Sequence, residues 1–279
     1  SPLFTKKPVI AFIHEVAGEI WDYMYPFPIN HIGRWLESVF FRLYRKNYFW
    51  TDAPSTIDEL IKRGIPKKLC MAIPCPITVS DRIIILRAKK LRKPDYPSFV
   101  FASRLVKMKG IEEVIKAFSF IVQQYSDAHL TIIGSGEKPY VRSLHNMATD
   151  YGCIKNITFV GRVGEKEKFI LMAQAHILLH ASVKEGWGLV VLEAASVGTP
   201  SVVYNVSGLR DIVHDRKTGV IIHTNSPRDM ARDALALYED KIRYKQYQAN
   251  AIKWEQSLVW ENVADESLSL IKKAILKRV

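Results

Sequence analysis

Short apolar runs alternate along the chain with segments whose apolar residues recur at helical spacing. The runs lie at 8–13, 68–73, 98–103, 129–134, 157–161, 176–181, 201–204 and 219–222. They are apolar throughout, which is typical of strands covered on both faces. Helices are predicted between and after them, over 30–46, 110–125, 137–151, 165–174, 188–197, 227–238 and 260–276. Repeated strand-then-helix order predicts an α/β fold with parallel sheets of the doubly wound kind.

Segment 81–97 divides this pattern into two parts. It is rich in Arg and Lys and closes with two prolines, which predicts a basic linker. Residues 98–253 hold six predicted strands, enough for one complete Rossmann-like domain. Residues 1–80 hold two, too few for an independent parallel sheet, and are predicted to be the C-terminal remnant of a partial second Rossmann-like domain. The last segment, 254–279, is predicted to form a C-terminal helix that packs back on the N-terminal part.

Composition narrows the class of protein. With 279 residues, 48% hydrophobic and 24% charged, the chain is not disordered, collagen-like or coiled-coil. A net charge of +12, weighted toward the first third, indicates an anionic partner. Three cysteines offer no disulfide framework, and no apolar run approaches the roughly 18–20 residues of a membrane span. We therefore expect a cytoplasmic protein, with peripheral attachment to the cytoplasmic membrane face as a further expectation.

The most informative segment is KEGWGLVVLEAASVGTP, residues 184–200. Its glycine-rich strand-to-helix turn exposes backbone N–H groups that favour an anion, although such a turn can also be purely structural. Glu185 and Glu193 are about two helical turns apart, so both carboxylates can face one cleft at the carboxyl edge of the sheet. Carboxylates there accept hydrogen bonds well from sugar hydroxyls. The alternative is a capping Glu185 and a surface Glu193.

Other loops converge on the same sheet edge. SRLVKMKG, 103–110, follows a predicted strand and carries Arg104 and Lys109, two cations able to neutralise a diphosphate. GSG, 134–136, and GRV, 161–163, follow two further strands. Each loop alone is compatible with solvated surface charge. Together they favour a cleft for a nucleoside diphosphate.

These motifs resemble the family 4 retaining glycosyltransferases of the GT-B fold, the glycosyl transferases group 1. The resemblance rests on three segments. In EGWGLVVLE, two Glu residues are separated by seven others; the other two segments are ASVGTP and SRLVKMKG. It implies a nucleotide-sugar donor, such as a UDP- or GDP-hexose, bound mainly by the later domain without a metal. Three departures stand out: Ser103 replaces a usual glycine, Asp211 replaces a usual Glu, and IPCPI, 73–77, replaces I-P-N-G-V.

Residue roles follow from the resemblance. Arg104 and Lys109 would hold the diphosphate, Glu193 the ribose and Glu185 the donor sugar. The catalytic residues would be His14, Glu185, Arg104 and Lys109; the implied donor-binding residues are Arg104, Lys109, Gly134, Arg162, Val163, Glu185, Gly186, Trp187, Gly188, Leu189, Val190 and Glu193.

His14 follows the first predicted strand. In the family, a histidine placed in this way lies beside the donor sugar, whereas a lone histidine is otherwise structural or solvated. Glu15 would either orient it or be a surface residue. The resemblance also implies that part of the N-terminal, acceptor-binding domain is missing from this chain.

The predicted helix at 30–46 has two interpretations. Ile32, Trp35, Leu36, Val39, Phe40, Leu43 and Tyr44 share one face, with Arg34, Arg42, Arg45 and Lys46 off it. Such a helix packs in a core, the favoured interpretation, or lies on an anionic membrane surface.

The sequence therefore predicts a retaining glycosyltransferase that moves a hexosyl group to a glycan or lipid-linked acceptor. A GT-B nucleotide-sugar epimerase or phosphorylase would share the donor cleft. A basic nucleic-acid-binding protein is disfavoured, because the aromatics are not interleaved with basic residues on strands and no groove-reading motif is present. No nucleic-acid partner is expected.

Overall fold

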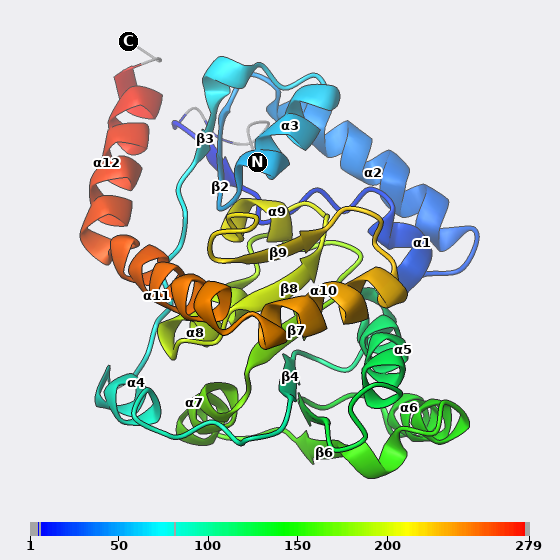
Figure 1. The fold of residues 1–279 in the computed structure, drawn as a ribbon. Helices are drawn as coiled ribbons and strands as arrows, with labels where there is room; N and C mark the ends of the chain where they lie inside the picture. The colour runs from blue at the N-terminus through cyan, green and yellow to red at the C-terminus, as the bar shows by residue number, and fades with distance from the viewer. Residues whose placement is uncertain (1–4, 6, 81, 277–279) are drawn as a thin grey trace.

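The computed structural model describes residues 5, 7–80 and 82–276, which form two parallel sheets (Figure 1). The larger has the order β6-β5-β4-β7-β8-β9. Its strands are β4 (Ser98–Ala102), β5 (His129–Ile133), β6 (Ile157–Gly161), β7 (Ile177–His180), β8 (Ser201–Tyr204) and β9 (Gly219–Ile222). The order reverses direction at β4 and β7, so their carboxyl ends flank the crevice in which such sheets bind ligands.

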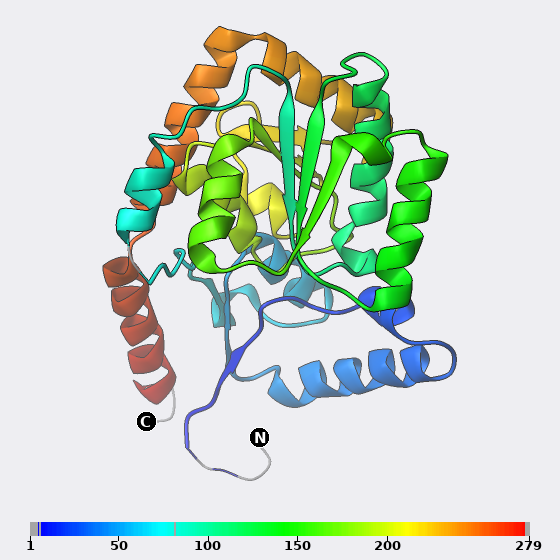
Figure 2. The ribbon, with the colours of Figure 1, turned by 90° about the horizontal axis from the view of Figure 1, so that it is seen from below.

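Helices cover both faces of this sheet, as Figure 2 shows. Alternate side chains of β4 face opposite ways: Phe99 and Phe101 pack in one core, Val100 and Ala102 in the other. The first core includes residues of α5 (Ile111–Val122), α6 (Lys138–Asp150) and α10 (Pro227–Glu239). The second includes residues of α7 (Glu165–Gln174), α8 (Leu189–Ser196) and α9 (Leu209–Ile212). Burial on both faces explains the apolar strand sequences.

The smaller sheet has the order β1-β2-β3. It consists of β1 (Ile10–Phe12), β2 (Tyr48–Thr51) and β3 (Cys70–Ala72). β2 was not predicted, because it is only four residues long and begins just after a helix whose aromatic pattern runs into it. α2 (Ile29–Tyr44) and α3 (Pro54–Lys62) contribute Phe41 and Leu60 to a small core with Ala11 and Phe49; α1 (Ile20–Met24) precedes α2.

α2 buries only part of the face that was expected to be apolar. Gly33 and Phe41 are buried, and the Trp21 ring lies so close to Gly33 that a Cβ there would come within 2.3 Å of it. Trp35 is 64% exposed and Leu36 54%, with Ile32 and Leu43 also exposed. The core interpretation therefore applies to the side of Gly33 and Phe41, and within the predicted apolar face only Phe40 and Tyr44 pack, partly buried, against the small core. None of the described helices combines the length and apolar character that crossing a bilayer requires.

The segment predicted as a linker, 81–97, contains α4 (Arg82–Ala88). Ile85 and Ala88 of this helix are buried in the second core of the larger sheet. The segment is therefore partly ordered against the later domain, because its apolar residues recur at helical spacing among the basic ones.

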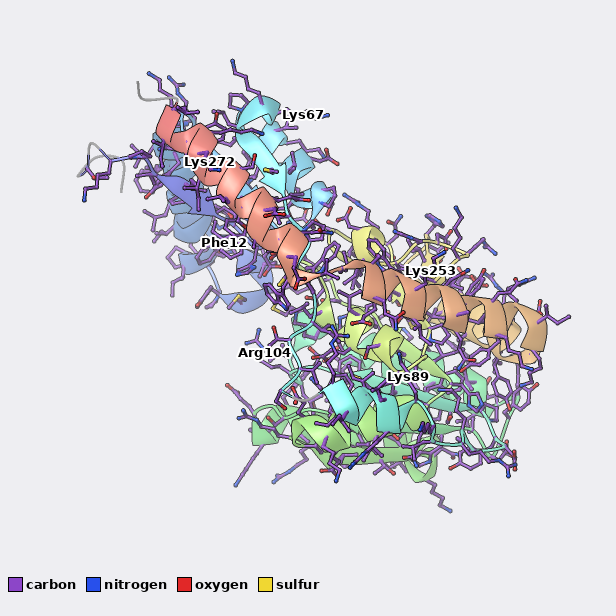
Figure 3. All side chains as sticks on the ribbon, turned by 90° about the vertical axis from the view of Figure 1, so that its left-hand side faces the viewer. Phe12, Lys67, Lys89, Arg104, Lys253 and Lys272 are labelled. Carbon is purple, nitrogen blue, oxygen red and sulfur yellow. The ribbon has the colours of Figure 1, made fainter. Side chains whose placement is uncertain are left out.

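The chain crosses between the two sheets twice, first after β3 and again between α11 (Lys241–Ser257) and α12 (Trp260–Leu276). In Figure 3, α11 runs along the later part and α12 beside the N-terminal sheet. The two crossings are neighbours: Val79 and Leu258 pack on the same core, and Arg82 pairs with the buried Glu255 at 3.2 Å.

Substitution of Phe118 tests whether the first core of the larger sheet is assigned correctly. Its ring is fully buried and packs edge-on against Phe99. Phe118→Ala should lower the free energy of unfolding by about 3–5 kcal/mol through lost burial and a residual cavity. Denaturant titration measures this, and Ile242→Ala, at a 76% exposed position, should change it by less than about 0.5 kcal/mol. Equal effects of the two substitutions would contradict the assigned core.

Candidate functional site

A pocket of about 650 Å³ opens at the carboxyl ends of β4, β5, β6 and β7. All of the predicted donor-site residues except Gly186 and Trp187 line it, together with Ala102, Ser103, Ile133, Ser135 and Lys168. The four loops singled out in the sequence are thus brought together, because parallel strands present their following loops at one edge. Figure 3 shows Arg104 on the later part, on the same side of the molecule as Phe12 of β1.

Glu185 is the most strongly held carboxylate of this pocket. Lys109 Nζ lies 2.7 Å and His180 Nε2 lies 2.9 Å from the same oxygen, Oε1. Burial alone raises the pKa of Glu185, but the hydrogen bonds from His180 and Lys109 and the positive charge of Lys109 outweigh burial and hold its pKa to about 2. Glu185 is therefore ionised at neutral pH and accepts hydrogen bonds only.

His180 was not predicted as part of the site. It ends β7, its side chain is fully buried, and its ring stacks on Phe101. Its Nδ1 is buried without a hydrogen-bond partner among the described residues. The ring proton is therefore assigned to Nε2, which donates to Glu185. The sequence did contain one indication of its role: it is a polar residue at the end of an otherwise apolar strand, in HILLHA.

A second ion pair lies on the opposite wall. Lys168 of α7 is 2.6 Å from Glu193 of α8. With Arg104, Lys109 and Arg162, the pocket contains four cationic side chains against two carboxylates. The excess of two positive charges complements a diphosphate. Arg104 is exposed and has no ion-pair partner among the described residues, so its guanidinium remains available to a ligand.

Two glycines allow the loops to close around this pocket. Gly134 has a φ of +143°, and a Cβ at this position would lie 1.8 Å from the carbonyl oxygen of Ser103. A Cβ at Gly186 would lie 2.8 Å from the carbonyl oxygen of His14. The second contact joins the two parts of the chain, and any larger residue would push them apart.

His14 lies in a neighbouring pocket of about 570 Å³, which Gly186, Trp187 and Glu185 also line. Its Nδ1 is 2.5 Å from the carboxylate of Asp52, whereas its side chain is 68% exposed. Asp52, not Glu15, therefore orients the imidazole. Burial raises the pKa of Glu15; Lys109 opposes this shift and Glu185 adds to it. Trp187 donates from Nε1 to the carbonyl of Cys75 at 2.9 Å, which fixes the IPCPI segment against the later domain.

Polar contacts also join the two parts beyond the pockets. The Ser55 amide donates to Asp211 at 3.2 Å, and the Ser55 and Ser207 hydroxyls are 2.8 Å apart. Lys184 pairs with Glu59 at 2.5 Å. Asp211, which stands where the family usually has Glu, thus places a shorter carboxylate side chain where the two parts of the chain meet.

Lys168, Asp52 and His180 are the functional candidates that sequence reasoning missed. Lys168 and Asp52 contact partners 25 and 38 residues away, so no local motif marks them, whereas His180 contacts Glu185 only five residues further along the chain. Among the described residues, no three His, Cys, Asp or Glu side chains lie close enough together to hold a metal ion.

Three comparisons place this geometry among known proteins. The pattern of the family described as Glycosyl transferases group 1 matches residues 83–254. D-inositol 3-phosphate glycosyltransferase of Paenarthrobacter aurescens is 29% identical over 195 residues, covering 68% of this chain and 47% of that protein. A GDP-mannose-dependent alpha-(1-6)-phosphatidylinositol monomannoside mannosyltransferase of Mycobacterium tuberculosis is 32% identical over 155 residues, covering 53% and 40%.

The fold is also found in solved structures. The chain resembles Anabaena HepE in complex with UDP and glucose with a TM-score of 0.77 and 18% identity, covering 95% of this chain and 72% of that one. The two sheets therefore form a GT-B arrangement. The chain spans under half the length of the curated relatives it matches, 46–48% of the first three.

The Glu185 network makes a prediction about acid stability. At neutral pH, Glu185→Gln should lower the free energy of unfolding by about 2 kcal/mol, because Lys109 and His180 lose a charged acceptor. The folded pKa of about 2 lies below the ordinary 4.5, so this stabilisation is present above pH 4.5 and is lost as the pH falls through about 2. Denaturant unfolding of both proteins across this range should show the two stabilities converging.

Glu261→Gln, at an exposed carboxylate, is the matched control and should follow the wild-type curve. A stability gap between wild type and Glu185→Gln that stays constant down to the lowest pH would show that Glu185 is not ionised in the way its contacts imply.

Proposed function

This chain belongs to the glycosyl transferases group 1 family, and on that premise we propose that it binds a nucleoside-diphosphate hexose and transfers the hexosyl group with retention. The observation that carries the proposal is the pocket beside β4, in which two paired carboxylates face four cations. That combination fits a ligand with both a diphosphate and hydroxyl-rich rings. UDP and glucose in the HepE complex, and GDP-mannose in the name of the mycobacterial relative, are ligands of this class.

The cations act on the leaving group. As the bond between the sugar and the diphosphate breaks, negative charge grows on the diphosphate oxygens. Arg104 binds them through its fork of donors, and Lys109 acts as a point charge already fixed in position by Glu185. The first amides of α8, at Leu189 and Val190, lack intrahelical partners and point to the same pocket.

The carboxylates act on hydroxyl groups. Both hydrogen bonds to Glu185 from Lys109 and His180 go to Oε1, and no described residue donates to Oε2, which could accept from the donor sugar. Glu193 would accept from the ribose, with Lys168 holding it toward the pocket. Backbone at Arg162 and Val163 would contact the base, and His14 would reach the sugar from the N-terminal part.

The acceptor is proposed to be a glycan or a lipid-linked sugar. The name of the mycobacterial relative describes action on a phosphatidylinositol monomannoside, which supports a membrane-bound acceptor in the family. Release of free hexose 1-phosphate, or of an epimerised nucleotide sugar, would instead indicate a phosphorylase or an epimerase.

Arg104→Ala tests the proposal without disturbing the fold, because this side chain is exposed and makes no ion pair among the described residues. It should weaken binding of the preferred donor and slow release of its nucleoside diphosphate by about a hundredfold, as should Lys109→Ala. Titration calorimetry with UDP-glucose and GDP-mannose measures the binding, and a coupled nucleotide assay measures the release.

Lys107→Ala is the matched control, since it removes an exposed cation from the same loop that does not line the pocket. Binding of neither donor by the wild type, or equal losses in Lys107→Ala and Arg104→Ala, would refute the donor assignment.

We also propose that the exposed α1–α2 surface contacts an anionic membrane. Large apolar and aromatic side chains are exposed there, including Tyr23, Met24, Phe27, Ile32, Trp35 and Leu36. Arg42 and Arg45, also exposed, lie at the end of the same helix. Apolar insertion beside basic residues is the pattern of helices that bind acidic lipid surfaces.

Vesicle sedimentation tests this surface. The protein should bind phosphatidylglycerol-containing phosphatidylcholine vesicles and bind pure phosphatidylcholine much less. The double substitution Trp35→Glu with Leu36→Glu should reduce binding about tenfold or more by removing apolar insertion and adding repulsion. Ile242→Glu, an exposed apolar position on α11, should leave it unchanged, and equal losses in both variants would argue against this surface.

A further inference from the structure

A further cavity lies at the amino edge of the larger sheet, at the opposite end of the strands from the donor pocket. It has a volume of about 330 Å³ and is lined by the end of α7, the residue after α8, the segment that follows α4 and the first turns of α11. His176, one residue before β7, forms part of the wall of this amino-edge cavity. No residue of the donor pocket lines it.

The charged side chains that line the amino-edge cavity are four lysines: Lys89, Lys93, Lys241 and Lys245. Among the described residues that line it there is no Asp or Glu, and none of the four lysines forms an ion pair with a described residue. Glu255, whose charge acts on Lys89, is paired with Arg82 at 3.2 Å. Asp240, at the start of α11, is paired with Arg243 at 3.2 Å. The positive charge of the cavity is therefore left without a compensating carboxylate on its wall.

Lys93 has a structural role that the other three lysines do not share. Its Nζ donates to the carbonyl of Ala173 at 2.8 Å, to the Thr199 hydroxyl at 3.1 Å and to the carbonyl of Ala175. These bonds use its three N–H groups and satisfy carbonyls at the end of α7. Lys93 therefore adds charge to the cavity but no free donor, and it already serves the helix end, which does not require the other three lysines.

The other three lysines supply free donors. Their side chains make no hydrogen bond to a described residue, and Lys241 Nζ lies 3.7 Å from the centroid of the Tyr238 ring. His176 adds a further donor, because its Nδ1 accepts from the Ser98 amide at 3.3 Å and the ring proton is thus assigned to Nε2. Nε2 has no hydrogen-bond partner among the described residues. An anion in the cavity would meet N–H donors and no competing carboxylate.

The positive charge also acts on the groups of the cavity themselves. Burial, together with the charges of Lys93 and Lys241, lowers the pKa of His176 to about 4. Burial lowers the pKa of Lys93 to about 7 and also lowers the pKa of Lys89. Each of these groups is displaced toward its neutral form, and a bound anion would favour the protonated form of the lysines.

We infer that the amino-edge cavity binds a small phosphorylated ligand, whose phosphate oxygens accept hydrogen bonds from Lys89, Lys241 and Lys245. A phosphate group combines negative charge with several acceptor oxygens, as these donors require. The wall also offers apolar side chains to the organic part of the ligand, those of Leu91, Ala173 and Val197. The α1–α2 surface and α4 lie on opposite sides of the molecule, which favours a soluble ligand over a lipid headgroup (Figure 1). The site is separate from the donor pocket and does not depend on the proposed function.

Titration calorimetry with pyrophosphate, at a constant salt concentration of about 0.15 M, tests this site. The whole chain carries Arg104→Ala, so that the donor pocket contributes little to the binding. Lys241→Gln with Lys245→Gln should weaken pyrophosphate binding at least tenfold, because two donors and two positive charges are lost. Both side chains are exposed, and circular dichroism checks that the variant folds.

Lys253→Gln with Lys272→Gln is the matched control, since it removes two exposed lysines of α11 and α12 that do not line the cavity (Figure 3). Its affinity for pyrophosphate should equal that of the parent protein. No pyrophosphate binding by the parent, or equal affinities of the two double variants, would overturn the inference. Vesicle binding that falls in the Lys241 and Lys245 variant while pyrophosphate binding does not would overturn it in favour of a lipid headgroup. Nucleotide binding by the chain with Arg104 intact tests the donor proposal separately.

Discussion

The whole site depends on the pairing of one carboxylate with two donors. Glu185 receives hydrogen bonds from Lys109, in the loop after β4, and from His180, at the end of β7. These two strands are neighbours in the sheet and mark its change of direction. The pairing compensates the burial of the charge, keeps Lys109 aimed into the pocket and holds the Glu185 loop against His14. Hydrogen bonds from the Val183 amide and the Ser182 hydroxyl to the carbonyl of Met108 join the same two loops.

Charge divides the cleft into two chemically different halves. On one side of Glu185 the cations outnumber the carboxylates, which suits a diphosphate. On the other side the lining is largely aromatic and, among the described residues, includes no Lys or Arg. Glu185 belongs to both halves, so the boundary between them coincides with the place where the sugar would change partners. This division follows from side chains on loops, strands and helices that are far apart in the sequence, and no single segment encodes it.

The sequence predicted the later sheet almost completely, because strands buried on both faces are apolar throughout and the intervening helices are amphipathic. β2 was missed because four residues after an aromatic helix carry no periodicity of their own. The Glu185, Arg104 and Lys109 loops were found because parallel strands fix where their following loops meet. His180, Lys168 and Asp52 were not found. Their partners lie 5, 25 and 38 residues away in the sequence, respectively, and only the packing of the folded chain brings each pair into contact. The buried face of α2 was predicted only in part: Phe40 and Tyr44 do pack against the small core, but Gly33 admits the Trp21 ring on a side that looks polar in sequence.

The two neighbouring chain crossings have a mechanical meaning. With Val79 and Leu258 packed on one core and Arg82 tied to Glu255, both covalent connections lie along one line. A change in the angle between the two sheets would therefore have to bend both connections together. The Ser55–Asp211 and Lys184–Glu59 contacts also span the two parts, so any such change would have to break them.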